Sequence, residues 1–371
     1  MSSKNQILKP TFIVNKKRVL SNIERMVTKA YQSGCKLRAH FKTHQSAAIG
    51  EWFREFEIDS IAVSSLDMAD YFADSGWKDI SVCVPVNVRQ IDQINQLNER
   101  TTLHVLAESP EAVSILAKQV EKTLNLWVEI DVGYGRTGIG YDDLGMLEKT
   151  IGVLKKSPKI RFMGILTHAG HTYGAGSVQG IREIYHDSLN KMEAAQSYFL
   201  NQGLENCKIS VGDTPSCSIV EKFEPSIDEI RPGNFVFYDL LQLRIGVCQE
   251  SEIAAAAVCP VIAKYPERIE IVIYGGGVHL SKEMLKLPNS HPYYGVACTY
   301  KEGEGWSSII NDAYVKGLSQ EHGIISTPAG VLNQTQIGDL FAILPIHSCL
   351  TANLATTYQT IEGDTLSSFR L

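Results

Sequence analysis

The stretch Leu37-Arg38-Ala39-His40-Phe41-Lys42-Thr43-His44 reads as a short strand that ends at a lysine and turns straight into a helix. The same unit recurs downstream, where apolar runs of strand length alternate with segments of helical periodicity. The expected strands are 36–41, 60–64, 80–85, 103–107, 126–131, 162–168, 208–212 and 229–237. Strands that alternate with helices in this way predict a parallel β/α (TIM-type) barrel. A doubly wound open sheet is the alternative, although no Gly-x-Gly-x-x-Gly follows the first strand.

The pattern changes after about Gly246, where few helical segments intervene between strand-like runs. These runs are 254–263, 269–274, 293–296, 323–326, 341–344 and 357–361. Gly, Pro, Asn and Asp separate them, which predicts a separate antiparallel β domain. Segment 11–14 is also extended and is expected to pair into that sheet. We therefore predict a barrel domain over 15–248 and a β domain over 1–14 plus 249–371.

The composition of the chain limits the classes of function that it can have. The chain has 371 residues, 44% hydrophobic and 20% charged, which suits a two-domain globular protein. A net charge of −6 without a long basic run argues against a nucleic-acid partner. The longest apolar runs, such as 253–262, are too short to span a bilayer, and Met1-Ser2-Ser3-Lys4-Asn5-Gln6 leads to no signal-peptide core. Eight scattered cysteines without a Cys-x-x-Cys pair predict reduced thiols in a cytoplasm.

Six motifs occur in a fixed order along the chain. They are 10–15, 38–44, 131–138, 229–239, 318–323, and 337–339 followed by Pro345-Ile346-His347-Ser348-Cys349. Together they resemble the D-threonine aldolase and D-serine dehydratase family, which is related to alanine racemase and has the type III fold of pyridoxal 5'-phosphate (PLP) enzymes. The resemblance covers nearly the full chain. It implies a barrel plus a β domain, and a homodimer with active sites near the subunit boundary.

Several residues after the barrel strands are implied to contact the cofactor or the substrate. Lys42 ends the first strand, and the resemblance implies that its amine holds PLP as a Schiff base. Arg136, in a glycine-rich turn after the fifth strand, is implied to reach the phenolic oxygen of PLP or the substrate. His168 is implied to stack on the pyridine ring, and His171 and Tyr173 are expected to line the substrate pocket. A solvated lysine, a surface ion pair and a core histidine are the structural alternatives for Lys42, Arg136 and His168.

The phosphate group of PLP needs hydrogen-bond donors. Gly212-Asp213-Thr214-Pro215-Ser216 follows the seventh strand and is expected to open a short helix, with the Thr214 and Ser216 hydroxyls as donors. A helix N-cap would use the same residues, and both roles are compatible. After the eighth strand, Arg231-Pro232-Gly233-Asn234 resembles the segment that contacts the pyridine nitrogen and the phosphate. An arginine there would leave that nitrogen unprotonated. Tyr238 is a further expected contact.

His347 and Cys349 are two residues apart, a spacing that places both side chains on one face of a strand. Imidazole with thiolate favours zinc, with manganese or magnesium as alternatives. A His-x-Cys motif is weak by itself, and the resemblance supports it. Aldolase members usually have an aspartate where this chain has Cys349, and the dehydratases have cysteine. The sequence thus favours a dehydratase.

The expected function is that of a PLP- and metal-dependent lyase acting on β-hydroxy D-amino acids of the D-serine, D-threonine or 3-hydroxyaspartate type. Lys42, His347 and Cys349 are the expected catalytic residues. A PLP-dependent amino acid racemase is the alternative, since it needs no metal, and a non-catalytic PLP carrier is a third. The segment 274–281 departs from the Asp-Ala-Gly pattern of relatives, which suggests a substrate that the best-known members do not share. Elimination by a dehydratase and aldol cleavage are both compatible with the sequence, and Cys349 favours elimination.

Overall fold

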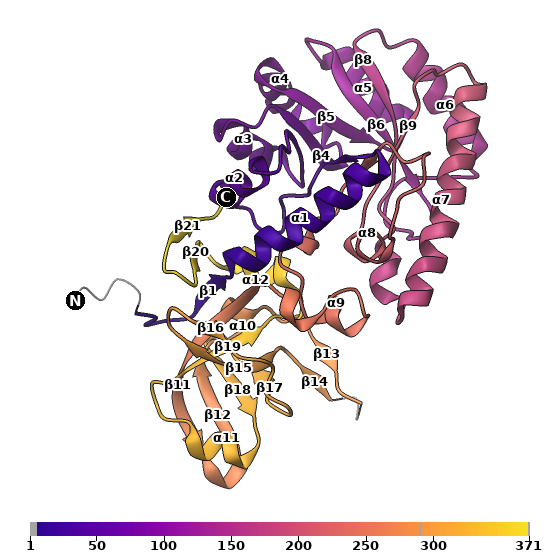
Figure 1. Ribbon diagram of the computed structural model, residues 1–371. Helices are drawn as coiled ribbons and strands as arrows, with labels where there is room; N and C mark the ends of the chain where they lie inside the picture. The colour runs from indigo at the N-terminus through magenta and orange to yellow at the C-terminus, as the bar shows by residue number, and fades with distance from the viewer. Residues whose placement is uncertain (1–5, 289–290, 370–371) are drawn as a thin grey trace. The chain divides into compact units, whose positions relative to one another are not determined.

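The computed structural model describes residues 6–288 and 291–369 and divides into two compact units (Figure 1). The barrel unit comprises 24–42 and 51–233. The described part of the β unit comprises 6–23, 43–50, 234–288 and 291–369. The predicted domain boundaries, 15–248 and 1–14 plus 249–371, stay a prediction. The prediction that no signal peptide is present falls on residues 1–5, outside the described part of the chain.

Eight parallel strands form the barrel. In order around the sheet they are β2 (Lys36–Leu37), β10 (Glu229–Ile230), β9 (Lys208–Val211), β8 (Ile160–Leu166), β6 (Leu124–Asp131), β5 (Thr102–Ala107), β4 (Asp79–Pro85) and β3 (Ser60–Val63). A parallel bridge from His40 to Ala62 closes the ring, and the amide of Phe41 donates to the carbonyl of Ala62 at 2.8 Å. The barrel prediction is confirmed, and the open doubly wound sheet is wrong.

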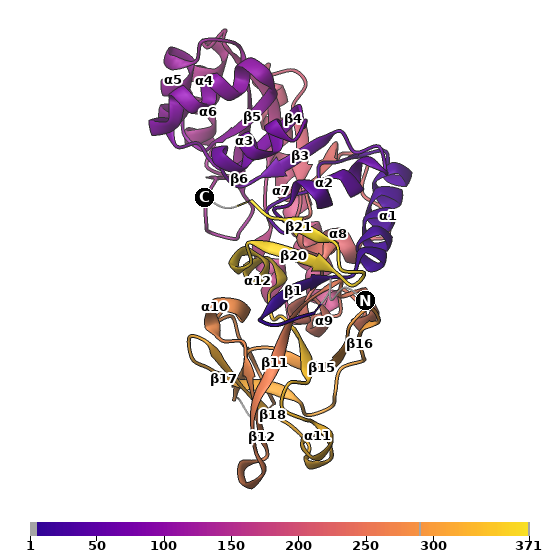
Figure 2. The ribbon, with the colours of Figure 1, turned by 90° about the vertical axis from the view of Figure 1, so that its left-hand side faces the viewer.

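Helices separate the barrel strands along the chain. They are α1 (Lys16–Ser33), α2 (Ala47–Arg54), α3 (Leu66–Asp74), α4 (Ile91–Arg100), α5 (Pro110–Gln119), α6 (Leu144–Lys155), α7 (Val178–Asn201) and the short α8 (Thr214–Ile219). Figure 2 shows α3 to α6 on the outer side of β3 to β6. Side-chain N-caps fix several helix starts, because Ser65, Ser109 and Asp143 each accept a bond from a first-turn amide. In the described part of the chain, no helix has the length and apolar content needed to cross a membrane.

The β unit is built on one large, mostly antiparallel sheet. Its order is β12 (Glu270–Tyr274), β18 (His322–Ser326), β17 (Tyr314–Leu318), β15 (Val296–Lys301), β19 (Leu340–Leu344), β11 (Ala255–Tyr265), β1 (Thr11–Val14), β20 (Thr357–Thr360) and β21 (Thr365–Ser367). The expected pairing of segment 11–14 is confirmed, since β1 runs antiparallel to β11 and parallel to β20. The expected strand 293–296 is instead split between β14 (Pro292–Tyr293) and β15.

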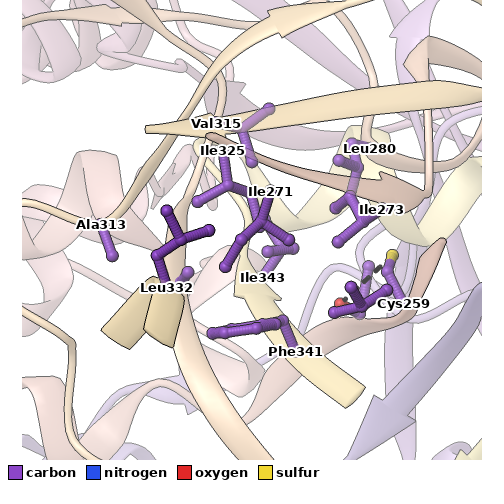
Figure 3. Close-up of a cluster of buried hydrophobic side chains, with 13 residues drawn as sticks. Cys259, Ile271, Ile273, Leu280, Ala313, Val315, Ile325, Leu332, Phe341 and Ile343 are labelled. Atoms are coloured by element: carbon purple, nitrogen blue, oxygen red, sulfur yellow. Dashed lines mark hydrogen bonds between the residues drawn. The ribbon is translucent and has the colours of Figure 1, made fainter. Parts of the chain in front are cut away.

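A cluster of thirteen buried apolar residues packs against this sheet (Figure 3). Phe341 and Ile343 of β19, Ile271 of β12 and Ile325 of β18 are at most 2% exposed. Burial of one such side chain contributes about 1.5–3 kcal/mol. The cluster gives β19 a firm support, and β19 leads directly into the segment that carries His347 and Cys349.

Three local predictions are wrong. The expected strand 36–41 is regular only over β2, 36–37, so Lys42 lies in a turn and not at a strand end. The expected strand 229–237 ends at Ile230, because the carbonyl of Pro232 accepts from His40 and a 3-10 turn, η3 (Asn234–Val236), follows. Residues 347–349 do not form a strand: His347 is the N-cap position of α12 (Ser348–Leu354), and Cys349 lies in its first turn. The same-face argument for the two ligands therefore fails, although their side chains meet by another route.

Candidate active site

Side chains that follow the barrel strands gather at one rim, because all eight strands run parallel and their C-terminal ends lie together. Lys42 is exposed in the turn after the His40 bridge, and its amide lies 3.4 Å from His40 Nδ1. Burial of His40, together with the charges of Lys42 and Arg231, holds the pKa of its imidazole well below the usual value. Since His168 and Arg136 also act on His40, the structure brings these predicted site residues within electrostatic reach of one another.

His168 lies two residues after β8 and is held in a fixed orientation. Its Nδ1 lies 2.7 Å from the carbonyl oxygen of Gly212, which can only accept, so Nδ1 is the donor. Burial lowers the pKa of His168 to about 3, against the opposing effect of the Gly212 bond. The ring is therefore neutral across the physiological range, and a neutral planar ring suits stacking on another aromatic ring.

The loop after β6 carries Arg136 and a residue that sequence reasoning missed. The guanidinium of Arg136 lies 5.2 Å from the ring centre of Tyr134. The Tyr134 ring stacks on His171, with centroids 6.1 Å apart, and meets His168 edge-on at the same distance. A Cβ on Gly170 would lie 2.5 Å from the Tyr134 ring, so glycine allows this close approach. Tyr173 is tilted against His168, at 6.5 Å.

The β9–α8 loop leaves two buried hydroxyls without partners. Asp213 is the N-cap of α8 and accepts from the Ser216 amide and the Thr172 hydroxyl, each at 2.8 Å. The alternative N-cap role is thus taken by Asp213. Thr214 and Ser216 are 1% and 2% exposed, and neither hydroxyl has a hydrogen-bond partner among the described residues. A buried hydroxyl without a partner is costly, so this loop suits a ligand rich in acceptor oxygens.

Arg231 follows β10 and is 4% exposed. Its Nε donates to Ser210 Oγ at 2.8 Å, and one terminal nitrogen donates to the Thr167 carbonyl at 2.6 Å. The guanidinium is therefore fixed in plane and direction. Gly233, two residues on, is half-buried at the end of the barrel unit.

A second set of polar side chains lies within the β unit. His347 Nδ1 lies 3.3 Å from Asp239 Oδ2, and Thr43 Oγ1 lies 3.2 Å from Cys349 Sγ. The Asn234 amide nitrogen lies 2.6 Å from Asp239 Oδ2 and 3.6 Å from Cys349 Sγ. The structure thus places Asn234 beside the thiol. Sequence reasoning missed Thr43 and Asp239, although both stand inside quoted motifs.

Two more residues complete this set. Ser348 accepts from the Asn234 amide at 2.9 Å and donates its own amide to Asp239 at 3.0 Å. Tyr238 is 4% exposed and has a φ of 48°, a left-handed conformation that is uncommon outside glycine. Such backbone strain persists only where the surroundings fix it, here next to the fully buried Asp239.

The His347 imidazole and the Cys349 thiol lie close enough to shift each other's ionisation. Burial opposes ionisation of Cys349, but His347, Thr43 and Asn234 together bring the pKa of its thiol below the usual value. Burial likewise opposes protonation of His347, and Cys349 and Asp239 outweigh it and raise the pKa of the imidazole. In the part of the chain that the structure describes, no group of three or more His, Cys, Asp and Glu side chains is arranged to hold a metal ion. The pair would thus offer two soft or borderline donors, with further positions left for water or substrate.

Comparisons with known proteins agree with this architecture. Residues 14–240 match the family model described as alanine racemase, N-terminal domain, and residues 254–361 match a putative serine dehydratase domain. The D-threo-3-hydroxyaspartate dehydratase of Delftia sp. strain HT23 is 26% identical over 96% of this chain and 94% of its own. The D-serine dehydratase of Dictyostelium discoideum is 25% identical over 99% and 97%.

A solved structure of the Delftia enzyme superposes on the whole chain, with a TM-score of 0.91, 25% identity and full coverage of both chains. A cysteine-to-alanine variant of a D-threo-3-hydroxyaspartate dehydratase, described as the metal-free form, superposes with a TM-score of 0.92, 25% identity and full coverage. The match over residues 14–240 spans more than half of the chain. The chain therefore belongs to the alanine racemase N-terminal domain family, in the branch that carries a serine dehydratase domain and includes the D-serine and D-threo-3-hydroxyaspartate dehydratases.

Proposed function

We propose that this protein is a PLP- and divalent-metal-dependent lyase that acts on β-hydroxy D-amino acids. The observation that carries the proposal is the neighbouring pair His347 and Cys349, which Asp239, Asn234 and Thr43 contact. A racemase has no use for such a pair, because exchange of an α-proton needs no Lewis acid. The dehydratase names of the relatives and the metal-free form of a cysteine-to-alanine dehydratase variant support the same reading.

The cofactor would lie at the barrel rim. Lys42 would hold its aldehyde carbon, and His168 would lie against its ring. The unpartnered Thr214 and Ser216 hydroxyls fit the phosphate oxygens. Arg231 would face the pyridine nitrogen, and Arg136 would face the phenolic oxygen or the substrate carboxylate. We assign Gly233, Asn234 and Tyr238 as further contacts, Asn234 with the added role of hydrogen-bonding Cys349.

The metal would lie at His347 and Cys349. Zinc is the ion that we assign, because imidazole and thiolate are its preferred donors, and manganese and magnesium prefer oxygen. Asp239 orients His347 through Nδ1, which leaves Nε2 for the ion. Thr43 and Asn234 hold the thiolate in place.

When bound, PLP would stabilise negative charge on the substrate α-carbon, and the ion would polarise the β-hydroxyl. Lys42 Nζ is the proposed base that removes the α-proton. Thr43 directly follows Lys42 in the chain, so the residue next to the proposed base is itself hydrogen-bonded to the proposed metal ligand Cys349. Neutral His168 does not compete for that proton, because its pKa of about 3 keeps it a weak base. His171 and Tyr173 would line the pocket that receives the substrate.

We place this chain with the dehydratases because Cys349 is a cysteine. The expected products are a keto acid and ammonia, and aldol cleavage to glycine and an aldehyde is the alternative outcome. D-Serine, D-threonine and D-threo-3-hydroxyaspartate are the candidate substrates.

We further propose a homodimer in a reducing compartment such as the cytoplasm. Val278 in helix α10 (Gly277–Leu280) and Leu350 in α12 are each 42% exposed, on two helices that contact each other, and large exposed apolar side chains side by side support a subunit contact. All eight cysteines are free thiols in the structure, which supports a reducing environment. Light scattering that gives the mass of a single chain for the fully active enzyme would contradict the dimer.

The test is to incubate the purified protein, loaded with PLP and zinc, with D-serine, D-threonine and D-threo-3-hydroxyaspartate. Keto acid, ammonia, glycine and aldehyde are measured together with the configuration of the remaining substrate. We expect keto acid and ammonia from at least one substrate. Loss of configuration without any other product would support the racemase alternative and contradict the proposal.

A further inference from the structure

A continuous line of buried polar side chains runs inside the barrel from Arg231 toward the opposite end. Arg231 Nε donates to Ser210 Oγ at 2.8 Å, and Ser210 donates to Glu229 Oε1 at 2.7 Å. Glu229 Oε2 accepts from Arg38 Nε at 2.6 Å, and Arg38 donates to Asp79 Oδ1 at 2.6 Å. The proposed reaction assigns no role to Ser210, Glu229 or Arg38.

The line is balanced in charge and closed to solvent at its centre. Arg38, Glu229 and Arg231 are 3%, 5% and 4% exposed, and Ser210 is fully buried. Burial disfavours the Glu229 carboxylate, but Arg38, Ser210 and Arg231 outweigh burial and lower its pKa, so it stays ionised. Two arginines thus face two carboxylates, Glu229 and Asp79. A buried ion pair often stabilises a fold little more than apolar residues of the same volume would, so stability alone gives weak grounds for this arrangement.

The Ser210 hydroxyl links the Glu229 carboxylate to the Arg231 guanidinium. A hydroxyl has one proton to donate, and here it points to Glu229. Its lone pairs are then available to Arg231 Nε, while the Thr167 carbonyl accepts from a terminal nitrogen of the same guanidinium. Without the Glu229 carboxylate, the Ser210 proton would have no fixed acceptor, and one of the three hydrogen bonds that hold the Arg231 guanidinium would lose its direction.

We propose that Glu229, anchored by Arg38 and acting through Ser210, is a positioning residue that fixes the Arg231 guanidinium and offsets part of its positive electrostatic field at the cofactor ring. The inference rests on the proposed function, in which Arg231 faces the pyridine nitrogen. Glu229 is separated from that ring by Ser210 and Arg231, so it touches neither cofactor nor substrate.

Two variants test this role through the pH midpoint of the visible PLP band and through the affinity for PLP. Glu229→Gln keeps the shape of the side chain and removes its negative charge. The pH midpoint of the visible band of bound PLP should therefore fall by about half a unit or more, which is about a threefold loss of proton affinity. Ser210→Ala keeps every charge and removes the relay, so the PLP dissociation constant should rise about tenfold, as for one hydrogen bond to a charged group. Ser210→Thr keeps the hydroxyl and should restore the affinity. Glu270→Gln is the matched control, because Glu270 also accepts from two cationic side chains, in the β unit, and should change neither quantity.

The possible results distinguish a failure of this inference from a failure of the proposed function. A purely structural role would lower the thermal midpoint of Glu229→Gln and Ser210→Ala while leaving the band midpoint and the PLP affinity unchanged, and this result would overturn the inference. If Glu229→Gln fails to fold, the Ser210→Ala and Ser210→Thr pair decides alone. A wild-type protein that binds no PLP overturns the proposed function and the inference with it. A wild-type protein that shows the band, with unchanged variants, overturns the inference alone.

Discussion

The barrel rim and the polar cluster around His347 and Cys349 in the β unit differ in the kind of ligand that their side chains suit. At the rim, Lys42, Arg136 and Arg231 supply basic side chains, the imidazoles of His40 and His168 are held neutral, and two buried hydroxyls have no partner in the described structure. In the cluster, Cys349 has hydrogen bonds with Thr43 and Asn234, and these together with His347 lower the pKa of its thiol. The rim is suited to an anionic ligand such as a phosphorylated cofactor, and the cluster to a cation. A substitution can therefore disable one of the two sites and leave the other intact.

The largest effect is expected at the rim, from Lys42→Ala. Removal of the only amine that we assign to the cofactor should abolish the visible PLP band, and loss of a general base should lower turnover by about a thousandfold or more. Absorbance and borohydride reduction followed by peptide mapping provide the measurement. Lys208→Ala is the control, because Lys208 is an exposed lysine at the start of the barrel strand β9, away from the rim. A reducible cofactor bound to another lysine in Lys42→Ala would contradict the assignment.

The next effect is expected in the cluster, from Cys349→Ala. Loss of the ion should reduce β-elimination by about a hundredfold or more, because hydroxide is a poor leaving group without a Lewis acid. The PLP band should stay, and exchange of the substrate α-proton in deuterated water should remain detectable by NMR. Cys298→Ala removes a fully buried thiol of β15 and should leave the zinc content near the wild-type value. Retention of full elimination activity by Cys349→Ala would show that the thiol is not a catalytic ligand.

A smaller effect is expected when the two rim hydroxyls are removed one at a time. Thr214→Val and Ser216→Ala should each weaken PLP binding about tenfold to fiftyfold, which corresponds to one hydrogen bond to a charged group. Binding of pyridoxal, which lacks the phosphate, should not change. Titration of the cofactor-free protein with both compounds measures the difference, with Ser218→Ala as a control in the same short helix. Equal losses for PLP and pyridoxal would place the phosphate elsewhere.

The smallest effect concerns stability and comes from Asp213. Burial raises the pKa of this carboxyl to about 6, against opposing bonds from Ser216 and Thr172. Since the folded state binds the proton more tightly than the unfolded chain, whose pKa is about 4, this group lowers stability as pH rises from about 4 to 6. Asp213→Asn should therefore be more stable than wild type by about 1–2 kcal/mol above pH 6, and equal to it or less stable near pH 4. Denaturant unfolding of the cofactor-free proteins at both pH values measures this difference, and a constant difference would contradict it.

The sequence predicts the barrel well because its signals are local. Each strand and helix shows its own periodicity, and parallel pairing then places residues after every strand at one rim, including Lys42, His168 and Arg231. In the β unit, local periodicity missed the strand β17 (Tyr314–Leu318), because Lys316 and Gly317 interrupt its apolar pattern.

The cluster was predicted less well because its geometry is tertiary. The segment after β19 is too short for periodicity to separate a strand from a helix start, so the route by which His347 and Cys349 meet was wrong. Thr43 and Asn234 come from distant parts of the chain, and no spacing in the sequence indicates that both contact the sulfur of Cys349. Tyr134 was missed for the same reason, since its place depends on the absence of a side chain at Gly170.

The central claim is that cofactor and metal serve separable steps of one lyase reaction. The most direct test is to treat the PLP- and zinc-loaded wild-type enzyme with a chelator, and to follow the visible PLP band and keto acid formation from D-serine and D-threo-3-hydroxyaspartate in the same sample. We predict that the band persists, that keto acid formation falls by about a hundredfold or more, and that added zinc restores it. Keto acid formation that continues at its original rate in the metal-free enzyme would contradict the account.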